Sequence, residues 1–286
     1  MSLTIPSDLL AQLHAGLASG EIVPYLGPGA LAHVTHKVTG KPIPADSNSL
    51  ILAMNNGQPM APRLMYEFPR AAMNVELKRG RGVVNKFLTT TYDSDDWTES
   101  AFHAWLAGFN PDYVIDVNRD IQFQQQWAGT PHILVVGIAR MAGTAFRYRL
   151  YQHDGEKYAE VSNESVDSSL PVLFKPMGTP RPNPDFIASD ADYVDYITEL
   201  MGGFSIPPFL KARRVGKRYL FLGLRLNRDT ERMVMSDIIY DCSTGPAAWA
   251  VIEEPTAKER RFCARMGIEI IEAPLSALLG EALEVA

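Results

Sequence analysis

Cysteine is scarce in this sequence of 286 residues, which contains Cys242 and Cys263 and no others. Two cysteines exclude a disulfide framework and a zinc site with four cysteine ligands. Low cysteine usage of this kind fits a reduced protein, so we expect a cytoplasmic location. The sequence predicts no metal site.

The sequence also lacks long apolar runs and an excess of positive charge. No stretch of about 18 apolar residues occurs, so no membrane span is predicted. Residues 1–6 contain no basic stretch before an apolar core, which argues against a secretory signal. The formal net charge of −6 disfavours nucleic acid as a partner. The short basic cluster at residues 78–81 is either a solvated surface or a site for a phosphate or a protein partner.

Apolar, β-branched runs alternate with helical patterns along much of the chain. Strands joined by helical crossovers require a largely parallel sheet that is covered on both faces. The length and the 46% hydrophobic content suit one large domain. We therefore predict a single α/β domain over residues 1–286 with a doubly wound, Rossmann-type sheet. The predicted strands are 22–26, 113–117, 132–139, 172–175, 218–222, 248–252 and 269–271.

Helix signals fill the segments between these strands. Ser7 is a candidate N-cap and Gly20 a candidate stop for the first helix. Ser189 or Asp190 is expected to cap a helix that runs through Leu200. A last helix is expected after Pro274. The other predicted helices are 50–54, 64–68, 71–77, 83–90, 100–107, 230–239 and 257–266.

The pattern of residues 121–168 departs from the simple alternation of strand and helix. It predicts a strand-rich elaboration of the same domain. Residues 146–151 and 158–161 are expected to pair as a hairpin around Asp154-Gly155. We expect Tyr148 and Arg149 to be exposed there and to form a partner surface. Alternatively, the inserted hairpin only covers the nucleotide site or a sheet edge.

The most informative segment is a short strand that ends in a glycine turn, Tyr-Leu-Gly-Pro-Gly-Ala-Leu at residues 25–31. Without Cβ atoms, Gly27 and Gly29 allow a tight turn and a close approach to a pyrophosphate. The third glycine of the dinucleotide fingerprint is missing, so an ordinary tight turn is the alternative.

Further motifs follow the glycine turn in a fixed order. Residues 111–120 read Pro-Asp-Tyr-Val-Ile-Asp-Val-Asn-Arg-Asp, and residues 173–179 read Leu-Phe-Lys-Pro-Met-Gly-Thr. Residues 188–193 read Ala-Ser-Asp-Ala-Asp-Tyr, and residues 219–226 read Tyr-Leu-Phe-Leu-Gly-Leu-Arg-Leu, followed by Asp-Thr-Glu-Arg at 229–232.

In this order the motifs resemble the sirtuin-like family, in the branch related to bacterial NAD-cleaving defence proteins. That branch has a Gly-Ala-Gly loop, a Thr-Thr-Asn-Tyr-Asp strand end, a Lys-x-His-Gly turn, a Ser-Asp-Tyr helix start and a Phe-Leu-Gly-Tyr strand. The resemblance spans roughly residues 9–275.

The resemblance implies NAD or ADP-ribose as the ligand or substrate, and it implies roles for particular residues. Asn118 matches the catalytic asparagine, whose carboxamide can orient ribose or a water molecule. Asp120 matches the aspartate of the same motif, in a structural or a chemical role. Alternatively, either residue caps the next helix. The implied cofactor-binding residues are Gly27, Pro28, Gly29, Ala30, Asn118, Gly178 and Gly223.

Several positions depart from the family pattern. Met177 stands where the family has a histidine that acts as general base, and methionine cannot accept a proton. Pro28 replaces an alanine and removes one backbone donor, and Leu31 replaces a common serine. His33 or His36, which follow the glycine turn, are candidate replacement bases.

These observations favour a protein that binds NAD or an ADP-ribose-type nucleotide and has weakened or lost NAD cleavage. It would act as a sensor, a regulator or an assembly component, with a protein partner or homo-oligomer as further possibilities. The alternative is an active NAD glycohydrolase that releases nicotinamide. A deacylase is disfavoured because the zinc cysteines and the histidine are missing. Arg140, after the strand at 132–139, is a candidate for contact with phosphate or for a surface salt bridge.

Overall fold

The computed structural model describes residues 4–139, 145–239 and 248–279. Arg140 and Cys242 lie outside these ranges, so the prediction for Arg140 has no structural counterpart here. Within the ranges, no helix has the length and apolar character needed to cross a membrane.

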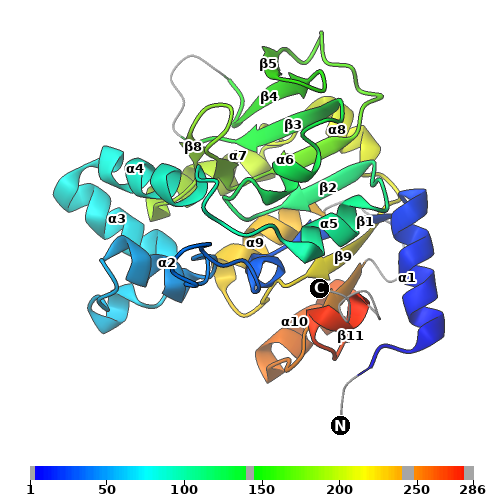
Figure 1. Cartoon of the computed structure of the whole chain (residues 1–286), viewed down its shortest axis with the longest axis horizontal. Coiled ribbons are helices and arrows are strands. Elements are labelled where there is room, and N and C mark those ends of the chain that lie inside the picture. The colour runs from blue at the N-terminus through cyan, green and yellow to red at the C-terminus, as the bar shows by residue number, and fades with distance from the viewer. Residues whose placement is uncertain (1–3, 140–144, 240–247, 280–286) are drawn as a thin grey trace.

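The described chain is built on one large sheet, which runs from β5 at the top of Figure 1 to β11 at the bottom. The strand order is β11-β10-β9-β1-β2-β6-β3-β4-β5. Neighbouring strands are parallel from β11 to β3 and antiparallel from β3 to β5. The prediction of a doubly wound, largely parallel sheet is confirmed. The strands are β1 (Ile22–Leu26), β2 (Tyr113–Asp116), β3 (His132–Gly137), β4 (Tyr148–His153), β5 (Tyr158–Val161), β6 (Val172–Lys175), β9 (Arg218–Leu222), β10 (Ala248–Val251) and β11 (Ile268–Ile271).

Side-chain alternation along the central strands divides the core into two layers. In β1, Val23 and Tyr25 pack on one face of the sheet, while Ile22 and Leu26 pack on the other. Helices α7, α8, α9 and α10 contribute to the first layer, and α1, α5 and α6 to the second. Both faces of the central strands are therefore covered, which explains why their sequences are almost continuously apolar.

Most helices lie close to their predicted positions, with three corrections. The predicted helix at 64–68 is absent, since Leu64 ends a 3-10 turn and the next helix begins at Phe68, where Pro69 favours a helix start. Pro6, not Ser7, is the N-cap of the first helix, and Ser7 is already helical. The segment after Pro274 is a single 3-10 turn as far as it is described. Gly20 ends the first helix with a left-handed φ of 72°, as predicted. The helices are α1 (Ser7–Ser19), α2 (Ser47–Met54), α3 (Phe68–Arg79), α4 (Arg81–Tyr92), α5 (Ala101–Ala107), α6 (Gln122–Gln126), α7 (Asp190–Met201), α8 (Pro208–Arg213), α9 (Asp229–Ile238) and α10 (Ala257–Met266), with 3-10 turns η1 (Pro28–Leu31), η2 (Pro62–Leu64) and η3 (Leu275–Leu278).

Helices α2, α3 and α4 form a separate apolar cluster in the connection from β1 to β2, beside the sheet in Figure 1. Arg81, at the start of α4, joins this cluster to the rest of the molecule. It forms an ion pair with Asp192 of α7 and donates a hydrogen bond to the carbonyl of Phe186 at 2.7 Å. Within the basic cluster at residues 78–81, Arg81 is therefore a structural cation, while Lys78 and Arg79 are exposed.

The predicted hairpin is present as β4 and β5, and it turns at Gly155, which has a φ of 104°. The expectation that Tyr148 and Arg149 are both exposed is wrong. Tyr148 is buried against Phe146, with ring centroids 5.1 Å apart, because it belongs to the core-facing side of the strand. Arg149 is partly covered and pairs with Asp185 at 3.5 Å. The hairpin adds two antiparallel strands to the edge of the sheet. The preceding strand, β3, belongs to the parallel part of the sheet, where it pairs with β6.

The start of α10 offers a simple stability test. Thr256 accepts a hydrogen bond from the backbone N–H of Glu259 at 3.2 Å, and Glu259 accepts one from the backbone N–H of Thr256 at 2.9 Å. Thr256→Ala is expected to lower the free energy of unfolding by about 1 kcal/mol, because one capping bond is lost. Urea denaturation measures the change. The exposed helical Thr90 is the control, since Thr90→Ala should stay within about 0.5 kcal/mol.

Candidate functional site

The motif residues gather where the parallel strands end. Gly27 follows β1, Gly223 follows β9, and Asn118 and Met177 lie two residues beyond β2 and β6. The strands β9, β1, β2 and β6 are consecutive in the sheet. The chain leaves β1 toward β2 and leaves the neighbouring β9 toward β10, in opposite directions along the sheet, and ligands of open α/β sheets bind at such a reversal. These four residues therefore share one edge of the sheet.

The glycine turn packs directly against the turn that follows β9. The backbone N–H of Gly29 donates to the carbonyl of Gly223 at 2.8 Å. A Cβ atom on Gly29 would lie 2.7 Å from the Cα of Gly223, which itself has a φ of 69°. Glycine is required at both positions because two backbones meet there. A bulky residue at Gly29 would therefore disturb the fold as well as any ligand.

This packing also uses the hydrogen-bond donors of the turn. The N–H of Gly27 donates to Leu222 at 2.9 Å, and the N–H of Ala30 donates to Gly27 at 3.0 Å. Pro28 has no N–H to offer. In this conformation the N–H groups of Gly27, Gly29 and Ala30 are all bonded to protein carbonyls. A bound pyrophosphate would have to contact other donors near the turn.

Two pockets adjoin the turn and share part of their walls. The small pocket has a volume of about 60 Å³ and is lined by residues that include Tyr25, Asn118, Arg119, Met177 and Tyr193. The large pocket has a volume of about 570 Å³ and is lined by residues that include Gly29, Gly223, Arg225 and Arg228. The residues that line both pockets are Pro28, Ala45, Ser47, Leu224 and Glu231.

Asn118 is buried at the wall of the small pocket. Its side-chain amide donates to the carbonyl of Gly27 at 3.0 Å, and its backbone N–H donates to Asp116 at 3.0 Å. The bond to Gly27 ties the end of β2 to the glycine turn. The carbonyl oxygen of the amide is the remaining acceptor of this side chain, so it can orient a ribose hydroxyl or a water molecule.

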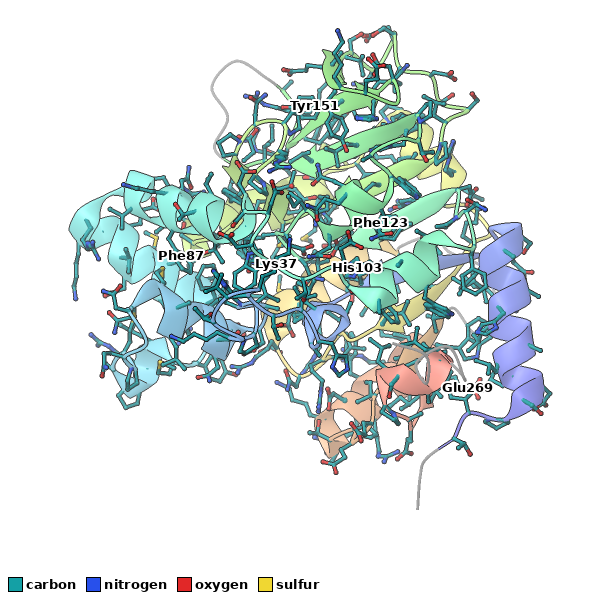
Figure 2. The ribbon with its side chains drawn as sticks, viewed as in Figure 1. Lys37, Phe87, His103, Phe123, Tyr151 and Glu269 are labelled. Carbon is teal, nitrogen blue, oxygen red and sulfur yellow. The ribbon has the colours of Figure 1, made fainter. Side chains whose placement is uncertain are left out.

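Asp120 does not line either pocket. One of its oxygens accepts the backbone N–H of Gln122 at 2.8 Å, but Asp120 is not the cap considered from the sequence, because the N-cap of α6 is Ile121. Its other oxygen and Nε2 of His103 are both buried without a hydrogen-bond partner among the described residues. Burial lowers the pKa of His103 to about 4, so its ring is neutral. His103 and Phe123 lie in the interior, on neighbouring helices (Figure 2).

One of three potential metal ligands near the site, Asp116, already has a cationic partner. His103, Asp116 and Asp120 offer ligand atoms within 4.8 Å of one another. Both oxygens of Asp116 are bonded, one to the backbone N–H of Asn118 and the other to Nζ of Lys175 at 2.6 Å. Burial raises the pKa of Asp116 to about 6, and the nearby Lys175 opposes that rise. The lysine therefore supplies the positive charge that a metal ion would bring.

Sequence reasoning did not single out Arg119, although it lies between two motif residues. Its guanidinium is buried and donates to the carbonyl of Ile187 at 2.6 Å and to the hydroxyl of Tyr193 at 3.3 Å. Because these partners are uncharged, they do not neutralise the guanidinium. Arg119 therefore contributes a positive charge to the wall of the small pocket. Tyr193 could have been found from the Ser-Asp-Tyr resemblance, because it is the tyrosine of that motif.

Other predicted residues lie away from the two pockets. Gly178 pairs with Phe186 between the short strands β7 (Gly178–Thr179) and β8 (Asp185–Phe186). Ala30 is buried beneath the turn and does not line either pocket. His33 is exposed, and His36 packs its ring against Trp97 with centroids 5.4 Å apart. Neither histidine lines a pocket, so the structure does not bring a replacement base from this loop.

The fold agrees with a comparison against family models. The SIR2-like domain model matches residues 85–271, which is more than half of the chain. The chain belongs to the SIR2-like family. SIR2-like domains bind NAD in general, and the matched segment contains Asn118, Met177 and Gly223. No curated protein matches the chain significantly.

The family match begins after the glycine turn, so the place of the turn in the SIR2-like site depends on the tertiary structure. Gly27 accepts the side-chain amide of Asn118, and Gly29 bonds to Gly223. The turn therefore contacts two residues of the matched segment that line the pockets, Asn118 and Gly223. The match is to the family as a whole, and the narrower resemblance to the defence branch stays a prediction.

Proposed function

We propose that this SIR2-like protein binds NAD or an ADP-ribose-type nucleotide and cleaves NAD weakly or not at all. It would act as a sensor, a regulator or an assembly component. The observation that carries the proposal is Met177, which is buried at the wall of the small pocket together with Asn118. The pocket keeps a group that can orient ribose and has an apolar thioether in place of the general base.

The large pocket suits the nucleotide part of such a ligand. Its volume of about 570 Å³ lies within the usual range for small-molecule sites, about 300–1,000 Å³. Arg225 and Arg228 supply positive charge for a pyrophosphate. Arg228 is placed over the ring of Tyr66, 4.8 Å from its centroid, and Arg225 is held by Glu259 at 2.8 Å. Both guanidiniums are thus positioned in advance.

The small pocket is too narrow for a nicotinamide ring as it stands. Its volume of about 60 Å³ corresponds to about two water molecules at about 30 Å³ each. Cleavage would require the wall formed by the start of α2 to move. Binding of ADP-ribose requires the large pocket alone. The two pockets therefore favour binding of the nucleotide over cleavage of NAD.

Binding can be tested with a substitution that fills the large pocket. Ala32 is exposed and lines this pocket, whereas the neighbouring His33 is exposed and does not. Ala32→Trp is expected to weaken ADP-ribose binding at least about tenfold, because the indole occupies ligand volume. Titration calorimetry with ADP-ribose and with NAD measures the change.

His33→Trp is the matched control, and its affinity should stay within about twofold of the original chain. Equal affinities for the two tryptophan variants would place the ligand elsewhere. Absence of binding of both nucleotides to the unaltered chain at millimolar concentration would contradict the proposed function.

The second candidate function is an active NAD glycohydrolase. It is favoured by one observation, namely that a carboxylate, Glu231, lines the same small pocket as Asn118. A carboxylate can accept a proton where methionine cannot.

A further inference from the structure

Glu231 is the carboxylate that the two pockets have in common. It lies in the first turn of α9, and its side chain lines both the small and the large pocket. Its Oε2 atom is buried and has no hydrogen-bond partner among the described residues. An unpartnered carboxylate oxygen in a pocket wall is an acceptor available to a ligand or a water molecule.

The surroundings of Glu231 place it close to the other small-pocket groups. Its charge acts on the phenols of Tyr25 and Tyr193, which line the same pocket. The pocket volume fits about two water molecules between these groups. A water molecule held there would lie at the boundary with the large pocket, where the nucleotide is proposed to bind.

We propose that Glu231 is the general base of a slow NAD hydrolysis and replaces the histidine absent at Met177. The proposal depends on the proposed function, because NAD must first occupy these pockets. In the step, the bond between C1′ of ribose and the nicotinamide nitrogen breaks, and nicotinamide leaves with the electron pair. The oxygen of water bonds to C1′, and its proton passes to the Glu231 carboxylate and then to solvent. Asn118 orients the water or the ribose.

The electrostatic environment matches the protonation state that this role requires. Burial is the main cause that raises the pKa of Glu231 to about 7, and the nearby Glu67 and Glu259 contribute to this rise. Arg228 and Arg232 oppose the rise. A base must be deprotonated before it can act, so the rate of hydrolysis is expected to increase as the pH rises through about 7.

The test compares nicotinamide release by the full chain with that by Glu231→Gln, at saturating NAD and between about pH 5 and pH 9. The glutamine variant is expected to release nicotinamide at least about tenfold more slowly and to lose the increase near neutral pH. Its affinity for ADP-ribose should stay within about twofold. Asp237→Asn, on the same helix and away from both pockets, is the control and should keep the original rate and pH profile.

The outcomes separate this role from the proposed function. Nicotinamide release that is unchanged in Glu231→Gln, or absent from the unaltered chain while ADP-ribose binds, overturns the role of Glu231 and leaves nucleotide binding intact. A variant that loses ADP-ribose affinity at an unchanged rate per bound NAD also overturns it, and assigns Glu231 to ribose binding. Failure of both nucleotides to bind overturns the proposed function itself.

Discussion

Lys175→Met is expected to lower the free energy of unfolding by about 3–5 kcal/mol. Lys175 Nζ lies 2.6 Å from Oδ2 of Asp116, and their side chains are 1% and 0% exposed. Removing the lysine leaves a buried carboxylate without its counter-charge, which is far more costly than losing an exposed ion pair. Urea denaturation, followed by circular dichroism, measures the loss.

The matched control removes both charges together. The double variant Asp116→Asn with Lys175→Met should recover a large part of the stability, because no uncompensated charge remains in the core. Asp116 also accepts the backbone N–H of Asn118, so both variants should be checked for ADP-ribose binding. A loss below about 1 kcal/mol in the single variant would show that water reaches the pair and that it behaves as a surface salt bridge.

Met177→His is expected to increase NAD hydrolysis above the slow rate proposed for Glu231, by up to the about 100- to 10,000-fold that a well-positioned general base contributes. Met177 is buried and lines the small pocket with Asn118, so a histidine there would face the group that orients ribose or water. Nicotinamide release, followed by chromatography, measures the gain.

Two further variants make this test specific. Met177→Leu keeps an apolar side chain of similar size and should leave the rate unchanged, while Asn118→Ala in the histidine background should cancel the gain. A histidine variant that binds ADP-ribose but gains no activity would show that the narrow pocket, not the absence of histidine at position 177, limits cleavage. Rapid release by the unaltered chain that depends on Asn118 would favour the glycohydrolase alternative.

Sequence reasoning located the strands that carry the site because buried parallel strands are short, apolar and β-branched. The run from Tyr113 to Val117 and the run from Arg218 to Leu222 both fell within one residue of the observed strands. Helix ends were less certain where no capping bond exists. The N-cap of α1 is Pro6, whose side chain offers no acceptor. The neighbouring polar residue Ser7 was predicted as the N-cap instead.

The expectation that Tyr148 and Arg149 are exposed on the hairpin was wrong for a different reason. Alternation along residues 146–151 identified a strand, but it did not say which face packs against the core. Tyr148 turned out to be 4% exposed, because the hairpin continues the main sheet and shares its apolar layer. A sequence pattern defines two faces of a strand, whereas the neighbouring strand and the covering helices decide which face is buried.

The sequence by itself determined the alternation of strands and helices, the order of the motifs and the presence of methionine at position 177. These features depend on local propensity and on residue chemistry, which the chain carries without reference to its fold. Only the tertiary structure decided which groups meet. It joins Gly29 to Gly223, buries Lys175 against Asp116, and brings Glu231 to the pocket of Asn118. Such contacts link residues about 60 to 200 positions apart, and their geometry comes from strand order and register, which local sequence does not encode.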